Sequence, residues 1–242
     1  MPHGAPDASD VIKREVYDRV GDLAELAARL GAIPAFDRRG EWMFSQDFRD
    51  GGGAWTGIAG GVGAGMAKDT SYFLTGGASW KLSGASAGGA FMDAWIQLAY
   101  PDAEDIGLEM WISINGAQTY LTVTLTVWDG TTTWAGGLRY DHVNHELQYK
   151  QDGPTWVKLA DLQLAVDLNP IFHNVKFVLD TAGGTYARAQ VDGFAYDIAG
   201  IAVAHGASTS LRLLQIGVRT DDKAASQSIA YIDSVILTRN EP

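Results

Sequence analysis

The sequence predicts an all-β protein, a two-sheet antiparallel jelly-roll sandwich, preceded by one N-terminal amphipathic α-helix. Two observations predict the sandwich: segments with apolar residues at every second position follow one another along most of the chain, and turn-forming dipeptides separate them at short intervals. A third observation predicts the helix, because only residues 10–31 carry a long apolar pattern with helical spacing. We therefore expect a tail and helix in residues 1–34 and a β-sandwich domain in residues 35–242.

The helix is expected over "DVIKREVYDRVGDLAELAARLG", where Ser9 or Asp10 can cap its start and Gly31 with Pro34 can end it. Gly21 weakens its middle by about 1 kcal/mol relative to alanine, so the helix requires a partner to be stable. Its apolar residues recur at alternating spacings of four and three, which is typical of a coiled-coil seam: Val16, Val20, Leu23, Ala27 and Leu30.

This seam favours self-association, or docking into a groove of another protein, over packing on a sheet of its own domain. Parallel association would most naturally produce a homotrimer of sandwiches. Dimers stay open, because valine and leucine at the seam do not fix the number of helices.

After the helix, residues 35–48 switch to a period of two, which predicts a strand with Trp42 and Phe44 on one side. The glycine-rich segment 51–65, "GGGAWTGIAGGVGAG", is either a flexible loop or tightly packed backbone. Further strands are expected at 71–74, 78–83, 90–100, 106–114, 119–128, 132–140, 145–150, 155–159, 171–180, 184–192, 194–198, 209–219 and 228–239.

Turn chemistry separates several of these strands, at Asp129-Gly130, Asp152-Gly153-Pro154, Gly183-Gly184 and Asp192-Gly193. Alternation is clearest in "TYLTVTLTVW", where one face carries Leu121, Val123, Leu125 and Val127 and the other carries Tyr120, Trp128 and the threonines. In "TYARAQVD" the same pattern places Ala187, Ala189 and Val191 opposite Tyr186, Arg188 and Gln190. One buried face and one polar face per strand are typical of antiparallel sheets packed as a sandwich.

The net charge is −11, and the first forty residues hold only six of the 18 basic and seven of the 29 acidic residues, so the acid lies mainly on the β-part. Such a surface repels phosphate, which excludes nucleic acid and an anionic membrane as expected partners. The chain has no cysteine, which excludes disulfides and thiolate metal sites. No signal peptide and no apolar run of membrane-spanning length is visible, so we expect synthesis in a cytoplasm without Sec export.

The C-terminal half resembles the concanavalin A-like lectin/glucanase superfamily, in its laminin-G-like branch. The segments that carry the resemblance are "GLRYDHVNHELQYK", "HNVKFVLDTAGGTYARAQVDGFAYDIAGI" and "IAYIDSVILT", and the resemblance spans residues 41–239. These are packing patterns, so the resemblance implies the jelly-roll fold and says little about activity.

The order of a helix, then "FDRRGEWMFSQDF", then such a jelly roll resembles the structural proteins of tailed bacteriophages. In those proteins such modules sit on the outside of the capsid or tail. The resemblance implies a virion protein, made in the host cytoplasm, with capsid or other virion proteins as partners.

The glucanases of the superfamily carry paired carboxylates on one strand, and no strand here supplies that pair, so we expect no enzyme and no catalytic residue. The acidic segment "PDAEDIGLE" contains Asp102, Glu104, Asp105 and Glu109. We interpret it as a solvated acidic turn, with a Ca²⁺ site built from these oxygens as the alternative.

The segment "DHVNHE" brings Asp141, His142, His145 and Glu146 within six residues, and imidazole and carboxylate groups both bind divalent ions. The simpler interpretation is a hairpin turn without a metal. His173 precedes an alternating strand and is expected to make a structural hydrogen bond. No nucleophile elbow, P-loop or dinucleotide fingerprint is present.

A small-ligand site is predicted on the polar strand faces, because aromatic rings stack on sugar rings and nearby polar groups bind hydroxyls. Its residues are Trp111, Tyr120 and Trp128, joined by Tyr186, Arg188 and Gln190 if the strands are neighbours. The alternative is that these aromatic residues pack under loops or at a subunit contact.

The sequence therefore predicts a non-enzymatic phage virion protein, a capsid decoration or fibre-like component. In it the helix oligomerises or docks, and the sandwich faces outward with weak glycan binding. The alternative is a lectin-like carbohydrate-binding module without a virion role, and an enzyme is the third candidate.

Overall fold

The computed structural model describes residues 39–85, 89–100, 104–153, 155–166, 169–223 and 226–242. The expected helix, with Val16, Val20, Leu23, Ala27 and Leu30, lies outside the described residues, as does the whole of the predicted unit 1–34. Every regular element in the described residues is a strand, and none of them forms a helix that could cross a bilayer.

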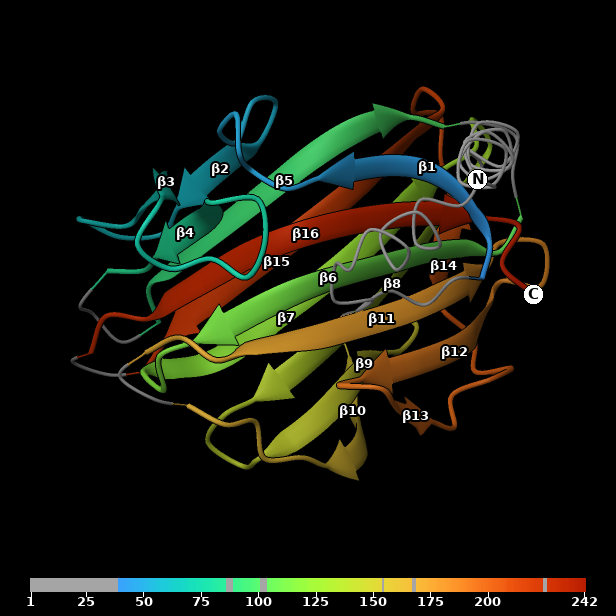
Figure 1. The fold of residues 1–242 in the computed structure, drawn as a ribbon. Coiled ribbons are helices and arrows are strands. Elements are labelled where there is room, and N and C mark those ends of the chain that lie inside the picture. The colour runs from blue at the N-terminus through green and yellow to red at the C-terminus, as the bar shows by residue number, and fades with distance from the viewer. Residues whose placement is uncertain (1–38, 86–88, 101–103, 154, 167–168, 224–225) are drawn as a thin grey trace, which may run out of the picture.

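Sixteen strands make up the described part (Figure 1). In chain order they are β1 (Glu41–Gln46), β2 (Thr56–Ala59), β3 (Gly65–Asp69), β4 (Ser79–Ser83), β5 (Phe91–Ala99), β6 (Ile106–Ile114), β7 (Gln118–Trp128), β8 (Thr132–Asp141), β9 (Glu146–Lys150), β10 (Trp156–Asp161), β11 (Phe172–Asp180), β12 (Thr185–Val191), β13 (Phe194–Tyr196), β14 (Ala204–Ala207), β15 (Leu213–Asp222) and β16 (Ile229–Arg239).

The strands form two eight-stranded sheets that pack face to face. Sheet A has the order β13-β12-β11-β6-β16-β4-β3, with β1 also paired to β16; sheet B has the order β10-β9-β8-β7-β15-β5-β2, with β14 also paired to β8. Every pairing is antiparallel, for example β7 with β8 and β6 with β11. The predicted all-β, two-sheet antiparallel sandwich is therefore confirmed.

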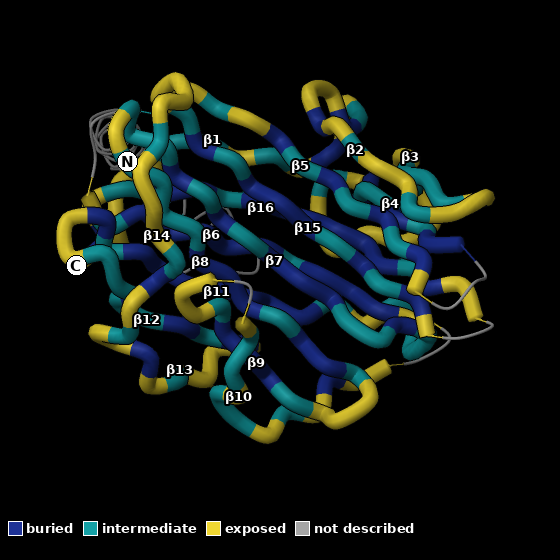
Figure 2. The backbone as a smooth tube through the Cα atoms, turned by 180° about the vertical axis from the view of Figure 1, so that it is seen from behind, coloured by how far each residue is buried: buried dark blue, intermediate teal, exposed yellow. Residues whose placement is uncertain are grey.

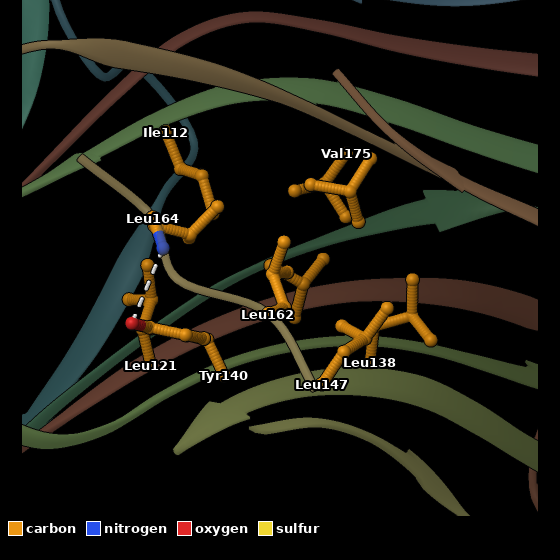
Figure 3. Close-up of a pocket in the computed structure, with 10 residues that line it drawn as sticks. Ile112, Leu121, Leu138, Tyr140, Leu147, Leu162, Leu164 and Val175 are labelled. Carbon is orange, nitrogen blue, oxygen red and sulfur yellow. Dashed lines mark hydrogen bonds between the residues drawn. The ribbon is translucent and has the colours of Figure 1, made fainter. Parts of the chain in front are cut away.

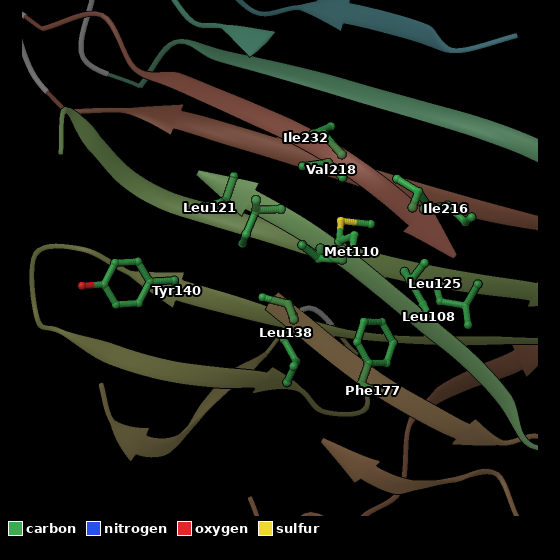
Figure 4. Close-up of a cluster of buried hydrophobic side chains, with 14 of the residues drawn as sticks. Leu108, Met110, Leu121, Leu125, Leu138, Tyr140, Phe177, Ile216, Val218 and Ile232 are labelled. Atoms are coloured by element: carbon green, nitrogen blue, oxygen red, sulfur yellow. The ribbon is translucent and has the colours of Figure 1, made fainter. Parts of the chain in front are cut away.

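The core lies between the sheets (Figure 2). Buried and partly exposed residues alternate along β5 and β15 of sheet B, whereas β6, β11 and β16 of sheet A are buried along almost their whole length. Sheet A contributes Leu108, Met110 and Phe177 to it, and sheet B contributes Leu125 and Ile216 (Figure 4). The alternation predicted for residues 119–128 is confirmed, because its four aliphatic residues are all buried.

The turn dipeptides join neighbouring antiparallel strands, as expected. Asp192 and Gly193 both have positive φ angles, of 51° and 80°, between β12 and β13. This backbone is that of a two-residue hairpin whose twist matches the flanking strands, and it favours aspartate followed by glycine. Gly130, with a φ of 98°, lies in the three-residue turn between β7 and β8.

The strand predicted at 71–74 is wrong. The carboxylate of Asp69 accepts hydrogen bonds from the backbone N–H groups of Ser71 (2.7 Å) and Tyr72 (3.1 Å), and this local turn ends β3. The next residues bend over the sheet, where the N–H of Leu74 binds the carboxylate of Asp233 at 2.7 Å. The backbone N–H groups expected to bind a neighbouring strand bind aspartate carboxylates instead.

Three strands escaped prediction, all at sheet edges. The glycine-rich segment forms β2 and the start of β3, which pair with β5 and β4. Gly57 in β2 is tightly packed, since a Cβ there would lie 2.4 Å from the terminal methyl carbon of Met92. The third is β14, "AHGA", which pairs with β8. Their small residues carry little strand propensity, so the partner strand decides their conformation.

The first strand also differs from expectation, because a register shift lies between Trp42 and Phe44 in β1. An extra residue at a bulge sends the next side chain to the opposite face. Phe44 packs against the core, whereas Trp42 is exposed. The two rings therefore do not share one side of the strand.

Candidate functional site

Charged side chains and the last residues of the described chain cover the outer face of sheet A. Glu109 and Lys176 point away from the core, yet only 3% and 1% of their surfaces are exposed. The Nζ atom of Lys176 lies 2.8 Å from the Glu241 carboxylate and 3.7 Å from that of Glu109. Glu241 also pairs with Arg188, so the charged groups on this face form a largely buried network of ion pairs.

Gly107 makes room for that network. A Cβ at this position would lie 2.6 Å from Oε1 of Glu241, so only glycine lets the carboxylate lie flat on β6. The backbone N–H of Glu241 is bound by the carbonyl of Asp105 at 3.1 Å, and Arg188 donates to the carbonyl of Pro242 at 2.8 Å.

The outer face of sheet B, by contrast, presents partly exposed aromatic and polar side chains. The strand registers place its residues in rows that cross β5, β15, β7 and β8. We define the sheet B outer face by Phe91, Asp93, Trp95, Gln97, Tyr120, Thr124, Thr126, Trp128, Arg139, Trp156, Gln215, Gly217 and Arg219.

The centre of this face is floored by small residues. Trp95, Gly217, Thr124 and Gly137 are successive cross-strand neighbours. A Cβ on Gly217 would lie 2.6 Å from Oγ1 of Thr124, and one on Gly137 would lie 2.5 Å from the carbonyl of Val123. Thr124 and the neighbouring backbone thus fill the space that a Cβ would take, so the middle of the row carries no side chain larger than threonine and the Trp95 ring stands at one end.

Amide groups border this floor. Gln97 and Gln215 are cross-strand partners, and the Nε2 atom of Gln97 donates to Oε1 of Gln215 at 2.9 Å. Gln215 is in turn opposite Thr126. Amide and hydroxyl groups in a row can bind the hydroxyls of a sugar while the nearby tryptophan supplies an apolar surface.

Two arginines lie in the adjacent row, on either side of Thr122. The guanidinium carbon of Arg139 lies 4.2 Å from the ring centre of Tyr120 and 4.7 Å from that of Trp156. Arg219 stacks on Phe91 at 3.9 Å and makes a two-atom ion pair with Asp221, whose closest contact is 2.6 Å. Burial lowers the pKa of Arg139.

Asp93 is the neighbour of Arg219 on β5. Burial raises the pKa of the Asp93 carboxyl, Arg219 opposes that change, and Asp221 adds to it. Asp93 and Asp221 are thus two carboxyl groups on the same face, held near one arginine.

Two of the six predicted ligand residues lie on this face, Tyr120 and Trp128. They occupy opposite ends of β7, about 27 Å apart at a rise of about 3.4 Å per residue. Trp111, Arg188 and Gln190 belong to sheet A and lie on the other side of the sandwich. The six residues therefore do not form one site.

Tyr186 is a correction to the expected polar face, because its side chain is 0% exposed. A register shift in the pairing of β11 with β12 falls between Val178 and Leu179, so Tyr186 turns into the core while Arg188 stays outside. Its hydroxyl accepts a hydrogen bond from the N–H of Gly137 at 2.8 Å and donates to the carbonyl of Lys150 at 2.7 Å.

Sequence reasoning missed Trp95, Arg139, Trp156 and Gln215. A signal for Trp95 was present, because "FMDAWIQLA" alternates Met92, Ala94 and Ile96 with Asp93, Trp95 and Gln97. Which strands are neighbours, however, depends on long-range pairing that the alternation of one strand does not contain.

The acidic segment and the histidine pair do not form a metal centre among the described residues, which contain no group of three or more His, Asp or Glu side chains suited to one. Asp102 lies outside the described residues. Glu109 is buried against Asn174 and Lys176, away from Glu104 and Asp105. Burial, with Asp180, Glu104 and Glu241 nearby, raises the pKa of Asp105.

The segment "DHVNHE" is the turn between β8 and β9. The carboxylate of Asp141 accepts hydrogen bonds from the N–H groups of Val143 and Asn144, at 2.9 and 3.0 Å. The His142 and His145 rings are 5.7 Å apart, edge to face, and His145 faces the Tyr140 hydroxyl at 3.2 Å. The predicted hairpin turn is therefore confirmed.

Two hollows lie away from this face. One is an apolar cavity of about 10 Å³ inside the sandwich, next to Tyr140, Leu162 and Leu164 (Figure 3). That volume is at the lower limit for one water molecule, so the cavity is a packing defect and not a ligand site. The other is an open crevice of about 450 Å³ at one end of the sandwich, lined by Tyr100, Glu104, Asp129, Trp134, Thr181, Ala182 and Asn240.

No protein-family model matches the chain, and no curated protein is found as a relative in a sequence search. Solved structures do match it. Cellulose-induced protein Cip1 is 16% identical over 81% of this chain and 97% of its own, with a TM-score of 0.56.

Two further structures match at a TM-score of 0.53. One is a carbohydrate esterase from the Shiga toxin-encoding bacteriophage phi24B, 16% identical over 83% of this chain and 99% of its own. The other is an endo-β-1,4-glucuronan lyase from the fungus Trichoderma reesei, 10% identical over 82% of this chain and 96% of its own. These likenesses establish the concanavalin A-like sandwich that the sequence resembles, and at this identity they establish the fold alone.

Proposed function

We propose that this protein binds glycans through the sheet B outer face and does not cleave them. The observation that carries the proposal is the row of Trp95, Gly217, Thr124 and Gly137, in which an aromatic ring borders a floor of small residues. A pyranose ring can lie on such a floor with its apolar side against the indole and its hydroxyls toward threonine and glutamine.

The second support is the polarity of the surroundings. Gln97, Gln215 and Thr126 offer donors and acceptors in the next row, and Trp128 offers a second ring at the far end of β7. A site made of a few aromatic rings and several neutral polar groups suits a neutral, hydroxyl-rich ligand. The structural neighbours named for carbohydrate chemistry, an esterase and a lyase, are consistent with a saccharide as ligand.

Glycan binding by the purified full chain tests the proposal, with an oligosaccharide array followed by titration calorimetry. We expect Trp95→Ala and Trp128→Ala each to weaken binding by about ten-fold, because each removes a stacking surface. Trp42→Ala is the matched control, since this exposed tryptophan belongs to sheet A and its loss should leave affinity unchanged.

Failure of the unaltered chain to bind any oligosaccharide would overturn the proposal. Release of reducing ends or unsaturated sugars would instead indicate an enzyme. Asp93→Asn then tests whether the carboxyl pair of Asp93 and Asp221 is responsible. Glu109 is not a candidate, because it is buried against Lys176. No turnover is expected.

A second candidate function is a role on a bacteriophage virion, with the sandwich displayed outward on capsid or tail. The order of an expected amphipathic helix followed by the sandwich favours it, as does the fold shared with a bacteriophage esterase. In this proposal residues 16–30 provide oligomerisation or docking, and linked copies raise the avidity of weak glycan contacts. Co-sedimentation of the protein with phage particles tests it.

A further inference from the structure

Arg139 is a cation of the sheet B outer face that contacts two aromatic rings. Its guanidinium lies between the rings of Tyr120 and Trp156, at 4.2 and 4.7 Å from their centres. Stacking on both sides fixes the plane of the group and reduces the conformational entropy that it would lose when a ligand binds. The guanidinium is therefore preorganised.

One edge of that guanidinium is held by a neutral side chain. The Nε and Nη2 atoms of Arg139 donate to Oε1 of Gln148, at 2.8 and 2.6 Å. The Nε2 atom of Gln148 donates to Glu146 at 3.0 Å, which orients the amide so that its oxygen faces the arginine. Arginine has five N–H donors, so this arrangement leaves further donors for a ligand.

Arg219, on the other side of Thr122, shows the opposite arrangement. Asp221 holds it through two oxygen atoms, with a closest contact of 2.6 Å, so its charge is already compensated. Within the described residues Arg139 makes no such ion pair, and its contacts there are one amide and two rings. The face thus carries one paired and one unpaired arginine in the same row.

The geometry points to Arg139 as the binding residue for the carboxylate of a uronic acid in the bound glycan. This inference rests on the proposed function and names the class of its ligand: acidic oligosaccharides in which a uronate accompanies neutral sugars. A guanidinium fork and a carboxylate fit each other through two parallel hydrogen bonds, which are stronger than bonds to neutral hydroxyls.

The surroundings of Arg139 limit the ligand to an isolated carboxylate. Asp141 and Asp221 lie near enough to act on its charge, and Glu146 follows beyond Gln148. Asp221 is paired with Arg219, and Glu146 with Lys158 at 3.1 Å, so Arg139 is the cation of this row that can receive one carboxylate. The acids around it disfavour a densely charged polyanion and favour a single carboxylate beside neutral sugars.

The test compares matched ligands on the full chain. An array carries uronate-bearing oligosaccharides, each beside its carboxyl-reduced counterpart, which has the same shape without the charge, together with neutral glycans. We expect the uronate form to bind about ten-fold or more tightly than its reduced partner. Arg139→Gln should abolish this preference and Arg139→Lys should retain part of it. Arg49→Gln is the control that should leave it intact, because this exposed arginine lies outside the sheet B outer face.

Each outcome either supports or overturns the inference. A preference for uronate that disappears only in Arg139→Gln supports the inference. Equal binding of the acidic and reduced members, or a preference that survives Arg139→Gln, overturns the inference while glycan binding stands. If the unaltered chain binds no member of the array, the proposed function fails and the inference fails with it. Thermal unfolding of each variant identifies any loss of affinity that is due to misfolding.

Discussion

At the scale of single residues, His173 illustrates how a buried histidine acquires a charge. Its Nδ1 atom lies 2.7 Å from the Asp192 carboxylate and its Nε2 atom lies 3.0 Å from the carbonyl of Ala165. Both neighbours are acceptors, so both ring nitrogens must carry a proton to satisfy them. Burial alone would lower the pKa of His173, but Asp192 and Ala165 outweigh it and raise the pKa.

The sign of the pH dependence follows. Because the folded-state pKa of His173 is above the unfolded value of about 6.5, its stabilisation is fully present below that pH and is lost as pH rises through the folded pKa. We expect the free energy of unfolding of the wild type, relative to that of His173→Gln, to decline across this range. Urea titrations at several pH values measure it, with His205→Gln, an exposed histidine on β14, as control. Parallel pH profiles for wild type and His173→Gln would refute the charged state.

The alternation of polar and apolar residues within single strands predicted only some residues of the sheet B outer face. Tyr120 and Trp128 were foreseeable because both lie on one strand with unbroken alternation. Trp111 was wrongly joined to them, since β6 and β7 follow each other in the chain but belong to different sheets. Arg139 could not be recognised as a site residue, because its ring partners come from β7 and β10. The hydrogen bond that His173 was expected to make is confirmed.

At the scale of elements, the bulge in the pairing of β12 with β11 allows a side chain of sheet A to bind the backbone of sheet B. It turns Tyr186 through the core, so that its hydroxyl bridges the backbone of Gly137 in β8 and Lys150 in β9. A periodic pattern cannot reveal a bulge, which is why the sequence predicted Tyr186 on the polar face. The two strands held in this way carry Arg139 and Gln148, so the core tyrosine also supports the candidate face.

Tyr186→Phe therefore tests an interaction between elements. The substitution keeps the ring but leaves a buried N–H and a buried carbonyl without their partner, and we expect a loss of about 1–3 kcal/mol in the free energy of unfolding. Chemical denaturation measures it. Tyr149→Phe is the control, because the Tyr149 ring packs on Tyr186 at 6.1 Å while its hydroxyl binds no residue that the structure describes. Equal stabilities of the two variants would show that the bridge contributes nothing.

At the scale of the whole molecule, the two outer faces differ in charge and in exposure. The outer face of sheet A is filled by the ion network of Glu109, Lys176, Arg188 and Glu241, whereas the sheet B outer face keeps its aromatic and polar groups partly exposed. Composition predicted an acidic β-domain but could not predict this asymmetry, because Glu241 meets Lys176 and Arg188 only after the chain has folded. The segment around Glu104 that was considered for Ca²⁺ lies at one end of the sandwich, beside the open crevice.

The number of copies in the assembly is also a property of the whole molecule, and it stays a prediction from the helical seam. We expect the full chain to be a trimer and a version that begins at Phe36 to be a monomer, because the truncation removes Val16, Val20, Leu23, Ala27 and Leu30. Light scattering coupled to size exclusion measures both masses. Two monomers would exclude self-association and leave docking to another surface, or packing on the same domain, as the function of the segment.

The edges of the two sheets have a consequence for the behaviour of the protein at high concentration. The central strands β6, β7, β15 and β16 contain nine to eleven residues, whereas the edge strands β13, β3, β10 and β2 contain three to six. β10 is further interrupted by a register shift beside Lys158. Short, bulged and lysine-bearing edges offer little backbone for a second molecule to extend. The short edge strands therefore protect the sandwich against edge-to-edge aggregation when the protein is concentrated.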